Sequence, residues 1–428
     1  MNNVYNVLLN RGFIEKTTND LEIEKLLQNE KITSYIGFDP TAPSLHIGSL
    51  IPIMALKHMQ LNGHRSIALL GGGTALIGDP SGKTEMRKML SVKDIEENAL
   101  NLKKQLSNFL CFEDNKGDVV NNYNWLSGVN YISFLRDIGK HFSVNRMIKA
   151  ESYKSRLETE EGLNFIEFNY MLLQAYDFYQ LYKDYSCLIQ MGGSDQWGNI
   201  IAGIELIRRK INKSAYGITF PLITTSNGVK MGKTVDGAIW LDSNRTNPFD
   251  YYQYWVNTED NDVKKFLLLF TLLPEEEISI VDDLKGKDLN NAKAILAFET
   301  TKIAHGIEEA TNAYNASISL FGKKNISDQI IPSSNIPRSS VIIDKDNTPF
   351  ISIDIQQLND GTKAVDIIKD YNMCKSKGEA KRLIKQGGIY INNKRIDSID
   401  YVISNNDIDK DAILFRIGKK KYFKIKIK

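Results

Sequence analysis

Residues 37–49 read GFDPTAPSLHIGS and combine several groups that suit nucleotide binding. Proline-containing turns lead from a predicted strand into a predicted helix with His46 and Gly48 at its start. Exposed N–H groups at a helix start attract phosphate, and glycine lets a nucleotide approach the backbone closely. A lone histidine there would more often cap or pack against the helix. Thr41, His46 and a glycine together favour a nucleotide site.

Two glycine- and lysine-containing segments also suit an anionic ligand. They are GDPSGKT, residues 78–84, and GVKMGKT, residues 228–234. A phosphate-binding Walker loop needs four residues between its first glycine and the GK pair, whereas each segment here has three. Neither segment is therefore a Walker loop, and a surface turn explains each of them equally well.

Tyr170, Gln174 and Asp177 recur at spacings of four and three residues. On a helix this spacing places all three side chains on one face. Such a face is either a buried polar cluster that joins helices or the wall of a binding pocket.

The elements that must hold these groups alternate between strand and helix in the first half of the chain. Apolar runs at 34–38, 65–71 and 187–193 are predicted strands, and helical patterns follow at 47–61 and 197–211. This alternation predicts an α/β fold with a Rossmann-like parallel sheet, whose ligands bind beyond the carboxyl ends of the strands. The pattern is helical from 247 to about 316, and a segment rich in Ser, Asn and Pro follows it.

Bulk properties indicate an ordinary globular protein. A length of 428 residues suggests two or three domains. The sequence contains no run of about 18 apolar residues, so we expect no membrane span. The N-terminus lacks a secretory or transit signal, so we expect a cytoplasmic location. The three cysteines lie far apart and form no metal-type pair, so we expect reduced, structural thiols and no bound metal.

The charge is unevenly distributed along the chain. Residues 361–428 contain 17 Lys and Arg against 8 Asp and Glu, a balance of +9, although the whole chain carries only +2. A basic terminal domain is typical of nucleic-acid binding, and a solvated lysine-rich surface is the alternative. Within this block, residues 375–396 predict a helix, a double-glycine stop and a hairpin that turns at Asn392 and Asn393. The helix would present an outward basic face made of Lys377, Lys381, Arg382 and Lys385.

Several strings together resemble one enzyme family. TAPSLHIGS is similar to the HIGH signature of class I aminoacyl-tRNA synthetases, and KMGKT is similar to their KMSKS signature. NYMLLQAYDFYQLY (169–182) and QMGGSDQWGNI (190–200) resemble the tyrosyl-tRNA synthetases in particular. The resemblance runs from about Tyr35 to Lys428, and the basic block resembles the small RNA-binding domain named after ribosomal protein S-four. It implies a catalytic domain at 1–246, a helical domain on the anticodon side at 247–320, a linker at 321–360 and the RNA-binding domain at 361–428.

The chemistry of tyrosine gives the helix face a specific role. A phenol donates one hydrogen bond and accepts another, so Asp177 can accept from it and Tyr35 can donate to it. Phenylalanine would leave these polar groups unpaired, and the resemblance implies that it is rejected in this way without an editing site. The resemblance also implies that Asp79, Tyr170 and Gln174 accept from the substrate ammonium and that Gln196 lies near its carboxylate.

Activation of tyrosine needs alignment and charge neutralisation but no general base, because the attacking carboxylate is already ionised. The resemblance implies that Thr41 and His46 donate to the terminal phosphate of ATP and that four basic groups surround the pyrophosphate. These groups are Lys83, Arg87, Lys230 and Lys233. The further ATP contacts that it implies are Gly37, Asp39, Gly48, Ser49, Gly193, Asp195 and Thr234. Mg²⁺ is expected to arrive with ATP, without a dedicated protein site or a prosthetic group.

The resemblance further implies tRNA(Tyr) as a partner and a homodimer. Ser49 replaces the second histidine of HIGH, Gly232 and Thr234 replace the serines of KMSKS, and Ile36 stands where the family often has a small polar residue. Many tyrosine enzymes vary the second signature in this way, so we expect somewhat weaker ATP contacts from Ser49 and Ile36 only. The alternatives are a tryptophan-specific homologue, a catalytically silent RNA-binding protein and a small-metabolite nucleotidyltransferase.

Overall fold

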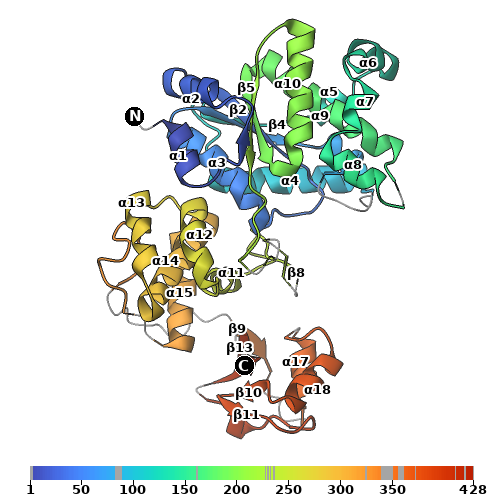
Figure 1. Cartoon of the computed structure of the whole chain (residues 1–428). Coiled ribbons are helices and arrows are strands. Elements are labelled where there is room, and N and C mark those ends of the chain that lie inside the picture. Colours follow the sequence, from blue (N-terminus) through green and yellow to red (C-terminus); the bar gives the residue numbers. More distant parts are fainter. Residues whose placement is uncertain are drawn as a thin grey trace. The chain divides into compact units, whose positions relative to one another are not determined.

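The computed structural model divides the chain into two compact units (Figure 1). It describes residues 3–81, 89–160, 162–226, 228, 231, 233–234, 237–322, 325–338, 350–354, 361–371, 373–409, 411–418 and 421–427. The first unit holds Met1–Ala310 and Asn325–Arg338, and the second holds Thr311–Lys324 and Ser339–Lys428. Helix α15 (Ile307–Phe321) belongs partly to each unit. No helix among the described residues is both long and apolar enough to cross a lipid bilayer.

A six-stranded sheet in the order β1-β6-β5-β2-β3-β4 forms the centre of the first unit. Its strands are β1 (Lys16–Thr17), β2 (Thr33–Phe38), β3 (Arg65–Leu70), β4 (Gly117–Asn121), β5 (Cys187–Gly193) and β6 (Tyr216–Phe220). Neighbours from β6 to β4 pair in parallel, and β1 pairs antiparallel with β6 at the edge. The Rossmann-like parallel sheet expected from the sequence is thereby confirmed.

The two central strands are buried because helices cover the sheet. TSYIGF of β2 and RSIALL of β3 are almost continuously buried, as expected for a parallel strand that is covered on both faces. The helices of this part are α1 (Val4–Asn10), α2 (Asp20–Asn29), α3 (Leu50–Leu61), α4 (Val92–Phe109), α5 (Tyr123–Leu126), α6 (Tyr131–Asp137), α7 (Val144–Met147), α8 (Glu151–Leu157), α9 (Phe165–Tyr185) and α10 (Trp197–Ile211). Figure 1 shows α9 and α10 side by side, and the two helices are in contact.

Helix α9 carries the polar face predicted above, and its first turn is fixed by buried polar contacts. Asn164 and Glu167 form a reciprocal capping box at its start. Arg156 of α8 forms a fully buried ion pair with Glu167, with 2.9 Å between Nη2 and Oε2. The hydroxyl of Tyr153 donates to the carbonyl of Phe168 over 2.8 Å. These contacts define where α9 begins and therefore which of its side chains face the sheet.

The region after residue 246 is helical, as predicted. Its helices in the first unit are α11 (Pro248–Val256), α12 (Val263–Phe270), α13 (Glu275–Ile278) and α14 (Gly286–His305). The buried ring of Trp255 on α11 contacts Phe266 and Phe270 on α12. Arg11, which follows α1, donates to the carbonyls of Leu268 and Thr271 at the end of α12 over 2.9 and 3.0 Å. This side chain therefore joins the N-terminal segment to the helical region.

The second unit contains a five-stranded sheet in the order β11-β10-β12-β13-β9, with two helices. Its elements are β9 (Phe350–Ile353), α17 (Ala364–Asp370), α18 (Lys377–Lys385), β10 (Ile389–Ile391), β11 (Lys394–Arg395), β12 (Ala412–Ile417) and β13 (Lys421–Ile427). The predicted helix and hairpin are confirmed, and the turn residues Asn392 and Asn393 have φ values of 45° and 65°. Strand β9, which pairs in parallel with β13, lies before residue 361, where we expected the last domain to begin. That boundary is corrected, because the sheet includes a strand from the expected linker.

Candidate active site

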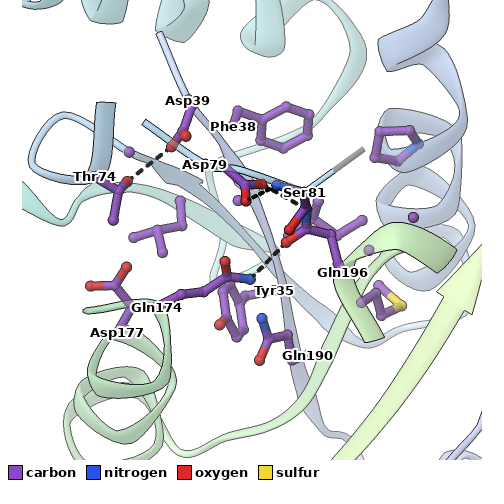
Figure 2. Close-up of a pocket in the computed structure, with 18 of the residues that line it drawn as sticks. Tyr35, Phe38, Asp39, Thr74, Asp79, Ser81, Gln174, Asp177, Gln190 and Gln196 are labelled. Atoms are coloured by element: carbon purple, nitrogen blue, oxygen red, sulfur yellow. Dashed lines mark hydrogen bonds between the residues drawn. The ribbon is translucent and has the colours of Figure 1, made fainter. Parts of the chain in front are cut away.

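A cavity of about 370 Å³ lies beyond the carboxyl ends of the central strands, where the chain order reverses between β2 and β5 (Figure 2). In open parallel sheets this is the position at which ligands bind. Most of the site residues predicted from the sequence line this cavity. They are Tyr35, Gly37, Asp39, Thr41, Gly48, Ser49, Asp79, Tyr170, Gln174, Asp177, Gly193, Asp195 and Gln196.

One end of the cavity carries two buried groups that suit a phenol. Tyr35 on β2 is 1% exposed and Asp177 on α9 is 1% exposed. Within the described part of the chain the Tyr35 hydroxyl has no hydrogen-bond partner. Burial and the nearby Asp177 charge raise the pKa of Tyr35 well above its ordinary value, so this hydroxyl is a donor at neutral pH. The pair therefore offers one donor and one carboxylate acceptor.

Asp177 is held by two side chains that follow β4. Asn122 donates from Nδ2 to Oδ2 over 2.9 Å, and the Trp125 indole donates from Nε1 to Oδ1 over 2.8 Å. Burial raises the pKa of Asp177 to about 7, although both hydrogen bonds act in the opposite direction and the Asp39 charge adds to the increase. Burial disfavours the charged carboxylate, and the two donors offset part of that cost.

Asn122 also connects Asp177 to the loop after β3. Its Nδ2 donates to Oγ1 of Thr74 over 3.0 Å, and its Oδ1 accepts from the Gly73 N–H over 2.7 Å. Thr74 in turn donates to Oδ1 of Asp39 over 2.9 Å (Figure 2). The side chain of Asn122 is 1% exposed, so all three contacts form away from solvent. One hydrogen-bond network thus extends from Asp177 to Asp39.

A second polar group lies around Asp79 at the other side of the cavity. Gln196 donates from Nε2 to Oδ2 of Asp79 over 2.8 Å, and Gln174 donates from Nε2 to Oε1 of Gln196 over 3.2 Å (Figure 2). The Ser81 N–H donates to Oδ1 of Asp79 over 2.9 Å. Tyr170 donates its hydroxyl to Oδ2 of Asp39 over 2.9 Å. Carboxylate and amide oxygens at this end can accept from an ammonium group, and amide N–H groups can donate to a carboxylate.

Two glycines let backbone and carboxylates lie close together here. A Cβ on Gly71 would lie 1.9 Å from Oδ1 of Asp39, and one on Gly193 would lie 2.5 Å from Oδ1 of Asp195. Any larger residue at either position would displace a carboxylate that lines the cavity.

The turn that leads into α3 is paired with the segment that follows β8. His46 accepts from the Gly48 N–H at Nδ1 over 3.0 Å and so caps the helix start. Backbone hydrogen bonds join Ile47 N–H to the Ile239 carbonyl over 3.0 Å and Leu241 N–H to the Leu45 carbonyl over 2.8 Å. His46 is not one of the residues that line the cavity, and its expected phosphate contact stays a prediction.

Side chains of helix α4 form hydrogen bonds with the same turn. Gln105 accepts at Oε1 from the Leu45 N–H over 3.0 Å and from the Ser44 hydroxyl over 3.2 Å. Asn98 donates from Nδ2 to the Pro40 carbonyl over 3.1 Å. These contacts hold both ends of the turn that contains Thr41.

The second lysine-containing segment is only partly described. Lys83, Arg87 and Lys230, which we expected around pyrophosphate, lie outside the described residues. Lys233 and Thr234 form β7 (Lys233–Thr234), whose backbone pairs with β8 (Gly237–Ala238). Among the described residues no group of three or more His, Cys, Asp or Glu side chains could hold a metal ion.

The predicted basic face of the second unit lies on α18. Lys377, Lys381, Arg382 and Lys385 are all exposed, whereas Ala380 and Ile384 are buried against the sheet. Ser376 caps the helix by accepting from the Glu379 N–H. Lys377 also pairs with Asp366 over 2.7 Å. The positive charge of this face is therefore only partly neutralised by a neighbouring carboxylate.

Comparison with known proteins identifies the family. Residues 27–322 match the family model described as "tRNA synthetases class I (W and Y)", and residues 346–425 match "Tyrosine--tRNA ligase SYY-like C-terminal domain". The "Tyrosine--tRNA ligase" of Desulfatibacillum aliphaticivorans is 57% identical over 99% of this chain and 98% of its own. The "Tyrosine--tRNA ligase" of Syntrophus aciditrophicus is 56% identical over 100% of this chain and 99% of its own. The chain belongs to the tyrosyl-tRNA synthetase family.

The solved structures agree with this membership. A C-terminally truncated mitochondrial tyrosyl-tRNA synthetase from Aspergillus nidulans is 30% identical with a TM-score of 0.68, and covers 75% of this chain and 95% of its own. A tryptophanyl-tRNA synthetase from Encephalitozoon cuniculi, at 14% identity and a TM-score of 0.55, shares the fold. Tyrosyl-tRNA synthetases are ligases that use ATP as a substrate.

Sequence reasoning missed the side chains that hold the site residues in place. Asn122 and Trp125 belong to the string NYNW, which directly follows the end of β4. The rule that ligands bind at carboxyl strand ends could have drawn attention to this string, but β4 itself was not predicted. Gln105 and Asn98 gave no signal, because single amides within an amphipathic helix look the same in the sequence whether or not they support a turn.

Proposed function

We propose that this protein activates L-tyrosine with ATP and transfers it to the terminal adenosine of tRNA(Tyr). The observation that carries the proposal is the pairing of a buried hydroxyl donor, Tyr35, with a buried carboxylate acceptor, Asp177, at one end of the cavity. A phenol satisfies both groups, whereas a phenylalanine ring satisfies neither. The indole of tryptophan is a donor only and would leave the Tyr35 hydroxyl unpaired.

The groups at the other end of the cavity fit the head of an amino acid. Asp79, Tyr170 and Gln174 would accept from the ammonium group, and Gln196 would lie beside the carboxylate. This assignment is supported by the hydrogen bonds that join Gln174, Gln196 and Asp79 along one wall of the cavity. Tyrosine would then span the cavity, with its phenol at Asp177 and its carboxylate near Gly193.

The carboxylate attacks the α-phosphorus of ATP, the tyrosyl-phosphate bond forms, and the bond to pyrophosphate breaks. The protein has to align the two reactants and neutralise the departing charge. We assign Gly37, Asp39, Gly48, Ser49, Gly193 and Asp195 to ATP, together with Thr41, His46 and Thr234. Lys83, Arg87, Lys230 and Lys233 would surround the pyrophosphate. Mg²⁺ would enter with ATP, held mainly by phosphate oxygens.

Transfer to tRNA would use the basic face of α18. Its exposed basic groups suit contacts with RNA phosphates, and they are Lys377, Lys381, Arg382 and Lys385. Contacts with phosphates determine affinity and position but do not recognise the base sequence. We therefore treat residues up to 246 as the catalytic domain, the following helices as the anticodon-side domain and the C-terminal unit as an RNA clamp.

We also propose a homodimer that works in the cytoplasm. Large apolar side chains are exposed on four consecutive helices, α6 to α9, and they include Ile132 at 70%, Val144 at 58%, Leu157 at 50% and Phe165 at 70%. We propose that these side chains form one apolar surface, since exposed apolar patches mark interaction surfaces. Sedimentation of the protein and of an Ile132→Asp, Phe165→Asp variant tests this point, since the variant should be monomeric and a monomeric wild type contradicts it.

ATP–pyrophosphate exchange with each of the twenty amino acids tests the proposed function. Exchange should depend on tyrosine, and the adenylate should charge tRNA(Tyr). Exchange with tryptophan alone would favour the tryptophan-specific alternative, and RNA binding without any exchange would favour a silent binding protein.

A further inference from the structure

Asn199 is a buried side chain that contacts three cavity residues but does not line the cavity itself. It lies in the first turn of α10 and is 2% exposed. Its Nδ2 lies 2.9 Å from Oε1 of Gln174 and 3.1 Å from Oε1 of Gln196. A longer contact of 3.4 Å reaches Oγ of Ser81. An amide nitrogen carries two hydrogens, so the two shorter contacts use its donor capacity.

These contacts determine which way both glutamine amides point. The carbonyl oxygen of each glutamine faces the Asn199 amide nitrogen, so each Nε2 faces away from it. The Nε2 of Gln196 accordingly donates to Asp79 over 2.8 Å, and the Nε2 of Gln174 donates to Oε1 of Gln196 over 3.2 Å. Reversing either amide would place two N–H groups against each other at Asn199.

The orientation leaves defined groups for the amino-acid head. Gln196 has a second N–H that is not used by Asp79, and this donor suits a carboxylate. Gln174 has a second lone pair on the oxygen that faces Asn199, and this acceptor suits an ammonium group. If both amides were reversed, Gln196 would present an oxygen toward Asp79, and the two like partial charges would repel each other.

We propose that Asn199 is a positioning residue that fixes the orientation of Gln174 and Gln196, and through them the recognition of the ammonium and carboxylate groups of the substrate. This inference rests on the proposed function, because it takes tyrosine to be the substrate. The phenol end is held by a separate set of side chains, so Asn199 should affect the head group of the substrate alone.

Binding of three ligands to the full-length protein tests this role. The ligands are tyrosine, tyramine, which lacks the carboxylate, and phenylalanine, which lacks the phenol hydroxyl. Asn199→Leu removes the donors while keeping the branching at Cγ, and Asn199→Asp replaces them with acceptors at nearly constant volume. In both variants tyrosine should bind at least about tenfold more weakly, as expected for a weakened hydrogen bond to a charged group. The preference for tyrosine over tyramine should fall by a similar factor, whereas the preference for tyrosine over phenylalanine should stay within about twofold.

Two further variants keep the test decisive. Asn199→Ser retains one donor and should give an intermediate loss, which also serves if the other two variants do not fold. Asn291→Leu removes a buried asparagine from α14 that is 2% exposed and donates to the Asn325 carbonyl, so it should lower stability without changing either preference. An unchanged tyrosine-to-tyramine ratio in folded Asn199 variants overturns the proposal, as does an equal fall in both preferences. Wild-type protein that does not prefer tyrosine over the other amino acids would refute the proposed function instead.

Discussion

The indole nitrogen of Trp125 donates a hydrogen bond of 2.8 Å to Oδ1 of Asp177, a carboxylate that is 1% exposed. Asn122 occupies the other oxygen of the same carboxylate. The acceptor proposed for the substrate phenol is therefore fixed in place before tyrosine arrives, and its ionisation depends on neighbours that never touch the reacting atoms.

Tyrosine affinity should depend on pH through Asp177. Because burial raises the pKa of this carboxyl to about 7, the protonated form dominates below that pH. A phenol that donates to the carboxylate binds the ionised form, so a proton must leave on binding, and affinity should fall by up to about tenfold per pH unit below pH 7. Calorimetric titration from about pH 5.5 to 8.5 measures the slope. Asp177→Asn should bind tyrosine weakly with no such slope, and an equal slope in that variant would assign the effect to another group.

Removing the Trp125 donor should move this transition to higher pH. Trp125→Phe takes away a hydrogen bond that favours the ionised carboxylate, so the pKa of Asp177 should rise above 7. Tyrosine affinity should fall several-fold to about tenfold at pH 7 and less at pH 9. Trp197→Phe on α10, where the ring packs against Lys16, is the matched control and should not shift the transition. A loss that is equal at both pH values would mean that Trp125 only fills space.

Loss of the Tyr35 hydroxyl should weaken the discrimination against phenylalanine. Tyr35→Phe removes one neutral hydrogen bond worth about 0.5–1.5 kcal/mol, which corresponds to roughly two- to tenfold in the ratio of kcat/KM for tyrosine over phenylalanine. Asp177→Asn should cost more because a charged acceptor is lost. Pyrophosphate exchange with both amino acids gives the ratio. Unchanged ratios in both variants would remove these residues from the phenol site.

Gln105 should matter for the use of ATP although it does not reach the cavity lining. Gln105→Leu leaves the Leu45 N–H without its acceptor, and an unsatisfied group of this kind costs about 1–3 kcal/mol. The turn that contains Thr41 should loosen, so adenylate formation at saturating tyrosine should slow about tenfold or need more ATP. Tyrosine binding should not change. Gln105→Glu keeps the acceptor and should restore most of the rate in single-turnover measurements, whereas equal defects in both variants would indicate a packing role.

A chain that ends at Arg338 should separate activation from transfer. This end point follows the structure, because residues 325–338 belong to the first unit and β9 belongs to the second. Exchange of pyrophosphate into ATP should persist, since every residue that lines the cavity precedes Arg338. Charging of tRNA at limiting concentration should fall strongly, and the full chain should lose tRNA affinity steeply with salt. Normal charging by the shortened chain would show that the C-terminal unit is not the clamp.

The sequence predicted the central strands from local signals and most of the cavity lining from its resemblance to one enzyme family. Continuous apolar runs identify buried parallel strands, and Asp79 and Asp195 belong to the Gly-containing segments that come after two of them. The supporting residues were not predictable in this way. Asn122 and Asp177 are 55 positions apart, and their contact depends on how α9 crosses the sheet. The early start of the C-terminal sheet was missed for a similar reason, since β9 is a four-residue strand inside a polar segment.

The side-chain amide of Asn122 has partners for both of its hydrogens and for its oxygen, and this limits how the pocket could be redesigned for other amino acids. Its two hydrogens and its oxygen are shared among Asp177, Thr74 and the Gly73 backbone. If Asp177 were replaced by a residue that suits an apolar ring, one N–H of the Asn122 amide would lose its acceptor. The amide would then reorient, and the orientation of Thr74 and Asp39 would change as well. Engineers who alter ring specificity should therefore expect slower activation unless positions 122 and 177 are randomised together in one library.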